Sequence, residues 1–151
     1  MSQYAVTSEG EEALAAATAE TVIAVVGVTT TKSKLIEWGV SFDGITAAAE
    51  PVLVELYQIT TSGTSTAATE IAWARDAVAA QATGFHSFTV EPSKGGRLAA
   101  YNVHPQGGGL VIQYPLGREP IISDGSTAQG IGVVVTAPAI VNCVAYMVFE
   151  E

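Results

Sequence analysis

Hydrophobic and polar positions alternate along residues 34–59, and this alternation predicts two β-strands. Side chains at a spacing of two fall on the same face of a strand, so an alternating stretch indicates a strand with one buried face. The predicted strands cover residues 34–42 and 52–59, and a short loop that opens with Asp43 and Gly44 joins them as a hairpin. The expected inward positions are Ile36, Trp38, Val40, Phe42, Val52, Val54 and Leu56.

Short apolar or alternating segments, separated by turn residues, continue along the rest of the chain. They predict strands over residues 21–29, 85–90, 97–104, 110–114, 121–122, 131–136 and 140–150. No regular helix connects these segments, so about eight or nine strands in two antiparallel sheets, packed as a β-sandwich, are expected. A jelly-roll arrangement is favoured over an immunoglobulin-like one because the strands spread over 151 residues, whereas immunoglobulin domains have about 100.

The chain is expected to form a single β-sandwich domain over residues 21–151, preceded by an N-terminal arm over residues 1–20. The start of the chain is polar and acidic, and terminal segments of this kind are poorly ordered unless they are docked. Residues 59–70, rich in Thr, Ser and Gly, predict a surface loop or the splayed end of a hairpin. Residues 71–83 predict mostly loop, with one helical turn near residues 76–80.

Fifteen acidic and six scattered basic residues give the chain a formal net charge of −9. Without a basic patch to neutralise phosphates, neither direct nucleic-acid binding nor attachment to an anionic membrane is expected. The longest apolar stretches are far shorter than the ~20 residues that span a bilayer, and residues 1–12 do not resemble a signal peptide. We therefore expect a soluble protein made in a cytoplasm.

Only 14% of the residues are charged, so much of the surface must be neutral. A neutral surface suits packing against other chains, although small residues on solvated strands give the same composition. Cys143 is the single cysteine and lies in an apolar segment, which predicts a buried small hydrophobic residue.

His86 and His104 are the candidates for a metal site. A metal-binding jelly roll of the cupin type needs two closely spaced histidines, a following glutamate and a later histidine, whereas GFHSFTVE supplies only His86 and Glu91. Positions 86 and 91 point to opposite faces of a strand, so surface or loop histidines are favoured and no metal is expected. Ser87 follows His86, but a serine nucleophile needs its base within hydrogen-bond reach, and adjacent strand residues face apart.

Two further patterns are candidates for catalysis or phosphate binding. Glycoside hydrolysis requires two carboxylates at a defined separation, but Glu37 and Glu55, on neighbouring predicted strands, are expected to face solvent. The run from Gly107 to Gly109 leads into a strand rather than a helix N-terminus, so it predicts a flexible hairpin loop and not a phosphate cradle. The other acidic candidates are Asp43, Glu70, Asp76 and Glu91. The sequence thus predicts no enzyme, no catalytic residue and no cofactor.

Six aromatic residues are candidates for a sugar-binding platform. Aromatic residues on strands more often fill the core or an interface. Trp73 lies beside a loop without an alternating partner and is the one most expected to be exposed. The six are Trp38, Tyr57, Trp73, Tyr101, Tyr114 and Tyr146.

Five segments of the chain are distinctive: IEWGVSFDG, VELYQ, GFHSFTVEPSKG, YNVHPQGGGLVIQYPLGREP and AYMVFEE. Together they resemble small proteins encoded among the virion structural genes of tailed bacteriophages, namely capsid decoration (cement) proteins and minor head proteins. The resemblance extends over roughly residues 20–151 and includes no functional-site motif.

The resemblance implies a β-sandwich protomer, commonly a homotrimer, on the outer face of an icosahedral shell, in contact with several subunits of the major capsid protein. An N-terminal arm often helps such proteins to clamp their neighbours. We therefore expect a virion structural protein that decorates and stabilises the capsid exterior after synthesis in the host cytoplasm. The alternative is a tail or head-fibre module that recognises a host-surface glycan.

Overall fold

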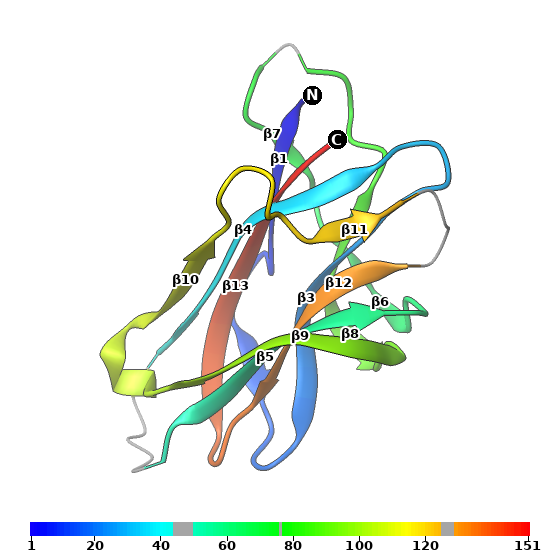
Figure 1. Ribbon diagram of the computed structural model, residues 1–151. Helices are drawn as coiled ribbons and strands as arrows, with labels where there is room; N and C mark the ends of the chain where they lie inside the picture. The colour runs from blue at the N-terminus through cyan, green and yellow to red at the C-terminus, as the bar shows by residue number, and fades with distance from the viewer. Residues whose placement is uncertain (44–49, 76, 125–128) are drawn as a thin grey trace.

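Figure 1 shows two β-sheets packed against each other. The strands within each sheet are antiparallel, and one hydrophobic core lies between the sheets. The computed structural model describes residues 1–43, 50–75, 77–124 and 129–151. Within these residues the chain has thirteen strands and one short 3₁₀-helix, η1 (Pro105–Gly107). The predicted antiparallel β-sandwich is confirmed.

The first sheet has seven strands and is built around the long neighbours β4 and β13. Its order is β10-β4-β13-β1-β7, while β11 pairs with the start of β4 and β2 pairs with the start of β13. The bounds are β1 (Gln3–Thr7), β2 (Glu12–Leu14), β4 (Ser33–Phe42), β7 (Ile71–Ala72), β10 (Gly109–Gln113), β11 (Ile121–Ser123) and β13 (Val141–Glu150).

The second sheet has six strands in the order β6-β8-β3-β12-β5-β9. The bounds are β3 (Ala19–Val26), β5 (Val52–Ile59), β6 (Thr64–Ala67), β8 (Thr83–Val90), β9 (Lys94–Val103) and β12 (Gly130–Thr136). Residues 131–135 of β12 are buried without interruption. This burial explains why β12 reads as a continuous apolar run and not as an alternating one.

Eight of the strands form a jelly roll. They pair as a nested hairpin, always antiparallel: β1 with β13, β3 with β12, β4 with β10, and β5 with β9. The chain changes sheet between β2 and β3, β3 and β4, β4 and β5, β6 and β7, β7 and β8, β9 and β10, β11 and β12, and β12 and β13. The predicted jelly-roll class is therefore confirmed. The expected eight or nine strands correspond to this framework, and the other five strands extend its edges.

The core between the sheets uses the predicted inward positions with one change. The buried members are Trp38, Val40, Phe42, Val52, Val54 and Leu56. A bulge interrupts the register of β4, because Val148 pairs with Glu37 while Phe149 pairs with Leu35. The bulge places Leu35 in the core, fully buried, and leaves Ile36 only half-buried.

The predicted hairpin over residues 34–59 is wrong. β4 belongs to the seven-stranded sheet and β5 to the six-stranded sheet, so their connection crosses from one layer to the other. Each strand has one buried face in either arrangement, and alternation therefore cannot distinguish a neighbour within a sheet from a partner across the core. Residues 44–49, including the glycine of the predicted Asp43-Gly44 turn, lie outside the described residues.

The N-terminal residues are part of the sandwich and do not form the expected arm. β1 lies between β13 and β7 in the first sheet. Tyr4 and Val6 are buried, and the Tyr4 ring stacks on Phe149 with ring centroids 5.4 Å apart. β2 adds Leu14 to the core. The prediction of an arm is therefore wrong for residues 3–14.

The connections agree only in part with the predicted loops. Residues 59–70 contain β6, which pairs with β8. Residues 77–80 are irregular and form no helical turn, and residue 76 lies outside the described part. Residues 105–109 connect β9 to β10 in the opposite sheet, so this glycine-rich stretch is not a hairpin loop.

Candidate functional site

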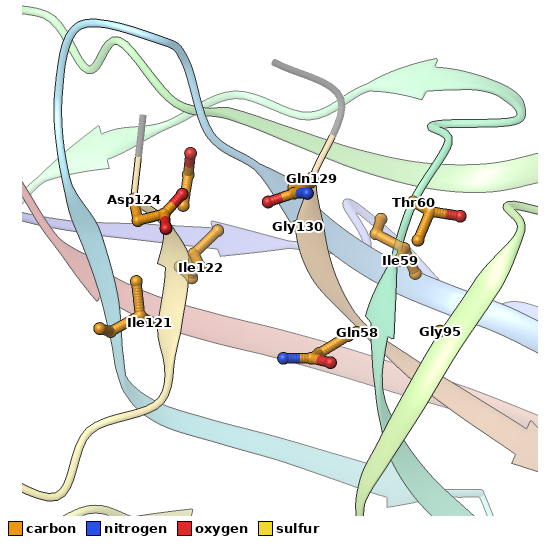
Figure 2. Close-up of a pocket in the computed structure, with 10 residues that line it drawn as sticks. Gln58, Ile59, Thr60, Gly95, Ile121, Ile122, Asp124, Gln129 and Gly130 are labelled. Carbon is orange, nitrogen blue, oxygen red and sulfur yellow. The ribbon is translucent and has the colours of Figure 1, made fainter. Parts of the chain in front are cut away.

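A pocket of about 260 Å³ opens where β11 of the first sheet approaches β5, β9 and β12 of the second. We call it the end pocket, and its polar side chains used below are Gln58, Asp124 and Gln129. Figure 2 shows Asp124 and Gln129 at neighbouring ends of β11 and β12, with Gln58 extending from β5 into the space between the strands. Three separate parts of the chain thus direct polar groups toward one space.

The end pocket combines free polar groups with an apolar floor. Gln58, Asp124 and Gln129 are exposed, and their side chains make no hydrogen bond within the described part of the chain. The apolar floor is Ile121, which is 54% exposed, while Ile59 and Ile122 beside it are almost completely buried. Convergent polar groups over an apolar floor are typical of small-molecule sites.

Two glycines allow the close packing that fixes the walls of the end pocket. A Cβ atom on Gly27 would lie 2.1 Å from Cβ of Ser123 on β11, and one on Gly130 would lie 2.2 Å from the carbonyl oxygen of Val25. The Ser123 hydroxyl also donates to the carbonyl oxygen of Val28 at 3.4 Å. Side chains at these glycines would push β11 and β12 away from their neighbours, so the pocket depends on their absence.

A second polar cluster connects β8 to the start of β2 and to the turn that precedes it. Nδ1 of His86 lies 3.2 Å from Oε1 of Glu12 and 2.9 Å from Oγ of Ser87. The Ser87 hydroxyl donates to the same Glu12 oxygen at 2.6 Å. Nε2 of His86 is buried 3.8 Å from Glu9 and has no hydrogen-bond partner among the described residues.

The geometry of this cluster differs from that of a catalytic triad. In a triad the serine and the carboxylate contact opposite nitrogens of the imidazole, so that one nitrogen takes the proton while the other is held. Here Ser87 and Glu12 both lie at Nδ1 of His86, and Ser87 donates directly to the carboxylate. The arrangement ties the start of β2 to β8 and does not prepare the serine as a nucleophile.

The structure corrects the predictions about His86 and Ser87. Ser87 has a φ of 50°, in the left-handed region, and this conformation breaks the strand alternation that would have kept the two side chains apart. His86 is 9% exposed and not a surface residue. His104 is exposed as predicted, and its Nδ1 accepts a hydrogen bond from the Gln106 N–H.

The third candidate metal ligand, Glu91, does not join His86. Its carboxylate accepts hydrogen bonds from the backbone N–H and the hydroxyl of Thr21 on β3. Among the described residues, no group of three or more His, Cys, Asp or Glu side chains is arranged to hold a metal ion.

The other candidate carboxylates each make a structural contact. They pair as Glu37 with the Tyr146 hydroxyl, Asp43 with the Asn142 amide, Glu55 with the Arg97 guanidinium and Glu70 with the Gly84 N–H. The expectation that Glu37 and Glu55 face solvent on neighbouring strands is wrong, because β4 and β5 lie in different sheets and Glu55 is 7% exposed. Residue 76 lies outside the described residues.

Cys143 is the buried small hydrophobic residue that the sequence predicts. It is 1% exposed, and burial, with smaller contributions from the charges of Glu12 and Glu20, raises the pKa of its thiol to about 12. The thiolate is the reactive form of cysteine, so Cys143 is unsuited to nucleophilic chemistry near neutral pH.

The outward side of the first sheet carries an uncharged patch, which we call the neutral face. Its members are Gly39, Ser41, Gly109, Val111, Val144 and Tyr146. They form two cross-strand rows over β10, β4 and β13. Val111, Gly39 and Tyr146 are register partners in one row, and Gly109, Ser41 and Val144 are register partners in the other. Val111 is 62% exposed and Val144 is 40% exposed. A shallow hollow of about 310 Å³ lies on this face, and its described lining contains no charged side chain.

The candidate aromatic platform does not form. Trp38 is fully buried in the core, where its indole N–H donates to the Tyr114 hydroxyl at 3.3 Å and its ring lies 6.2 Å from that of Tyr101. Trp73 is 62% exposed next to β7, which confirms the prediction that it is the exposed aromatic residue.

The end pocket escaped sequence reasoning because its lining comes from distant short segments with no shared motif. The only local signal was the brief strand predicted over residues 121–122, which is now β11. Glu12 was missed for a different reason: the acidic start of the chain predicted an arm, so its carboxylate was not considered beside His86.

Comparison with protein-family models, curated proteins and solved structures gives no match for this chain. In the described part of the chain, no helix has the length and apolar character needed to cross a membrane. The fold and surfaces therefore define the class: a jelly-roll β-sandwich with an uncharged outward sheet face and a polar pocket between the ends of its strands.

Proposed function

We propose that this chain is a virion structural protein that decorates the exterior of a bacteriophage capsid as a homotrimer and stabilises the shell by binding the major capsid protein. The observation that carries the proposal is the neutral face, where valine side chains remain exposed on a regular three-strand surface. Contiguous exposed apolar surface on a folded protein commonly marks an interaction site. We assign the neutral face to contact with the capsid protein.

The shape of the neutral face supports this assignment. Ser41 has a small side chain and Gly109 has none, and both are exposed, so a partner can approach the sheet backbone closely there. The Tyr146 ring rests on Gly39, where a Cβ atom would lie 2.5 Å from Cε1 of the ring. The hollow beside it gives a partner's apolar side chain a place to insert, which is how central interface residues contribute most to binding.

Stabilisation of the shell follows from linkage. A protein that binds the assembled shell and not its dissociated subunits lowers the free energy of the shell, by about 2.7 kcal/mol per site at a free concentration one hundred times Kd. The net charge of −9 favours a role outside the shell, because an acidic protein is repelled by packaged nucleic acid.

The test combines native mass measurement with shell binding. We expect the full chain to be a trimer that cosediments with empty shells of the encoding phage and raises their melting temperature. Val111→Lys and Val144→Lys should abolish cosedimentation while leaving the trimer intact, since a lysine on the neutral face must lose its hydration on binding.

Val78→Lys is the matched control, because Val78 is 79% exposed but lies in the loop after β7, away from the neutral face. A monomer that does not bind shells would overturn the proposed function. Loss of the trimer in the Val111→Lys and Val144→Lys variants would instead assign the neutral face to contacts between copies of this chain.

Glycan recognition by a tail or head-fibre module is the second candidate function, and the exposed Trp73 favours it. Tryptophan faces stack well on the apolar side of sugar rings, and a tryptophan that is 62% exposed is available for such contact. If this function holds, binding to a glycan array is lost in Trp73→Ala and retained in Trp73→Phe. Equal binding by all three proteins would exclude Trp73 as the recognition residue.

A further inference from the structure

We infer that the end pocket binds a single neutral sugar ring, either as a free monosaccharide or as the terminal residue of a glycan. This inference does not depend on capsid binding, because the end pocket and the neutral face share no described lining residue. It is carried by the convergence of Gln58, Asp124 and Gln129 beside the exposed apolar side chain of Ile121.

The polar groups of the pocket suit hydroxyl groups. Each glutamine amide of Gln58 and Gln129 offers two donors and an acceptor, and the Asp124 carboxylate offers acceptors only. A hydroxyl group donates and accepts at once, so neighbouring hydroxyls on a ring can satisfy both kinds of partner. Since these three side chains make no hydrogen bond within the described part of the chain, a ligand can bind them without breaking a contact to any described residue.

The apolar floor suits the face of a sugar ring. Ile121 is the isoleucine of the lining whose side chain a ligand can contact, because 54% of its surface is exposed. A sugar ring has hydroxyls at its edge and C–H groups on its faces, and it therefore matches a site that is apolar below and polar at the rim. The volume of about 260 Å³ lies just below the ~300–1,000 Å³ of typical small-molecule pockets, which limits the occupant to about one ring.

Other ligand classes match the pocket less well. Its described lining contains no lysine or arginine, and Asp124 would repel a phosphate or a carboxylate. A calcium ion needs about six to eight oxygen ligands within ~2.6 Å, and one carboxylate in a space of about 260 Å³ does not provide such a shell. A neutral ligand with donors and acceptors fits the two uncharged amides and the single carboxylate of the lining.

The walls of the end pocket are preorganised for ligand binding. Gly27 and Gly130 let β11 and β12 pack directly on neighbouring groups, at the distances given above. Walls that are already held by packing lose little conformational freedom on binding, which favours affinity.

The experiment measures binding of the full chain to a panel of neutral monosaccharides by ligand-observed NMR, with titrations of each binder. We expect at least one monosaccharide to bind. Gln58→Ala should weaken its binding about three- to tenfold, as for one lost neutral hydrogen bond, and Asp124→Ala about ten- to a hundredfold, as for a hydrogen bond to a charged group. Gln113→Ala is the matched control, because Gln113 is an exposed glutamine on β10, outside the pocket.

A glycan array separates the two sources of the ring. Binding to arrayed glycans that Asp124→Ala abolishes and Trp73→Ala preserves supports the end pocket as the site for a terminal residue, and monosaccharide binding without array binding supports a free sugar. The inference is overturned if no sugar binds in either assay, if Gln58→Ala and Asp124→Ala bind as well as the unchanged chain, or if the pocket takes a nucleoside such as adenosine in preference to every sugar. Because shell binding is measured separately, failure here leaves the capsid proposal standing.

Discussion

Tyr146 is part of the neutral face and also contacts two residues of β4 in the sheet beneath it. Its ring covers the backbone at Gly39, and its hydroxyl donates to Oε1 of Glu37 at 2.5 Å. Burial is the main cause that raises the pKa of Tyr146 to about 12, followed by the hydrogen bond to Glu37 and the negative charge of Glu37. One uncharged ring thus fills the gap left by a glycine and covers a carboxylate that would otherwise interrupt the apolar surface.

The raised pKa of Tyr146 predicts that the folded protein loses stability at high pH. An ordinary tyrosine has a pKa of about 10, and the folded state holds the proton more tightly. The contribution of Tyr146 to the free energy of unfolding is therefore complete below about pH 10 and is lost as the pH rises through about 12. Titration of phenolate absorbance should show a late transition that Tyr146→Phe removes.

Glu37→Gln tests the cause of the Tyr146 shift. This change removes the negative charge while keeping an oxygen that can accept the hydrogen bond, so the pKa of Tyr146 should fall toward its ordinary value. If Tyr146→Phe leaves the late transition in place, or if Glu37→Gln does not move it, the assignment to the Tyr146–Glu37 contact is incorrect.

The conformation of a single residue explains why the contact between Ser87 and His86 could not be predicted from the sequence. The contact of Ser87 with His86 depends on one left-handed backbone conformation, with φ at 50°. Nothing about a serine within an alternating segment distinguishes this conformation from an extended one. Trp73 and Cys143, by contrast, were predictable, because the exposure of one and the burial of the other depend only on their neighbours in the chain.

At the scale of elements, the sequence reveals strands and their buried faces more readily than their partners. The inward positions of β5, β9 and β13 follow from alternation, and the uninterrupted apolar run of β12 follows from burial on both sides. The partner of β4 does not follow from alternation, because β5 in the opposite sheet and a hairpin neighbour produce the same pattern. The sequence did not predict β1, because this strand has only five residues and lies beside acidic residues that are typical of a solvated terminus.

β1 provides a direct test of whether the chain start is structural. Val6 is fully buried, whereas Val78 is 79% exposed. Val6→Ala should lower the free energy of unfolding by about 2 kcal/mol, through lost burial and the cavity left behind. The same change at Val78 should stay within about 0.5 kcal/mol. Chemical denaturation of both variants measures the difference.

Equal stability of the Val6→Ala and Val78→Ala variants would support the original prediction that the N-terminal residues form an arm. In that case β1 would contribute nothing to the folded domain, and residues 1–8 would be free to reach a neighbouring subunit. A large loss at Val6 alone means that decoration of a shell must use surfaces of the sandwich itself.

At the scale of the whole molecule, the nested hairpin brings the two ends of the chain together. The N–H of Ser2 donates to the carbonyl oxygen of Glu151 at 2.8 Å, and the N–H of Glu151 donates to the carbonyl oxygen of Ser2 at 3.1 Å. Figure 1 shows both termini at the same end of the sandwich. The β1–β13 pair therefore closes the first sheet across the largest separation in sequence that the chain allows.

This closure predicts that the chain tolerates circular permutation at an exposed loop but not within the sheet. A short linker between Glu151 and Met1 only continues a pair that is already formed, and opening the chain between Leu116 and Gly117 cuts a tip where Leu116 is 95% exposed. Opening it between Trp38 and Gly39 instead divides β4, which pairs with β13, β10 and β11. Circular dichroism and denaturant titration should show a cooperative β-sheet fold for the first permutant and none for the second.

A folded second permutant would mean that β4 can assemble from two pieces. An unfolded first permutant would mean that the jelly roll requires the covalent order of β1 and β13, and not only their pairing.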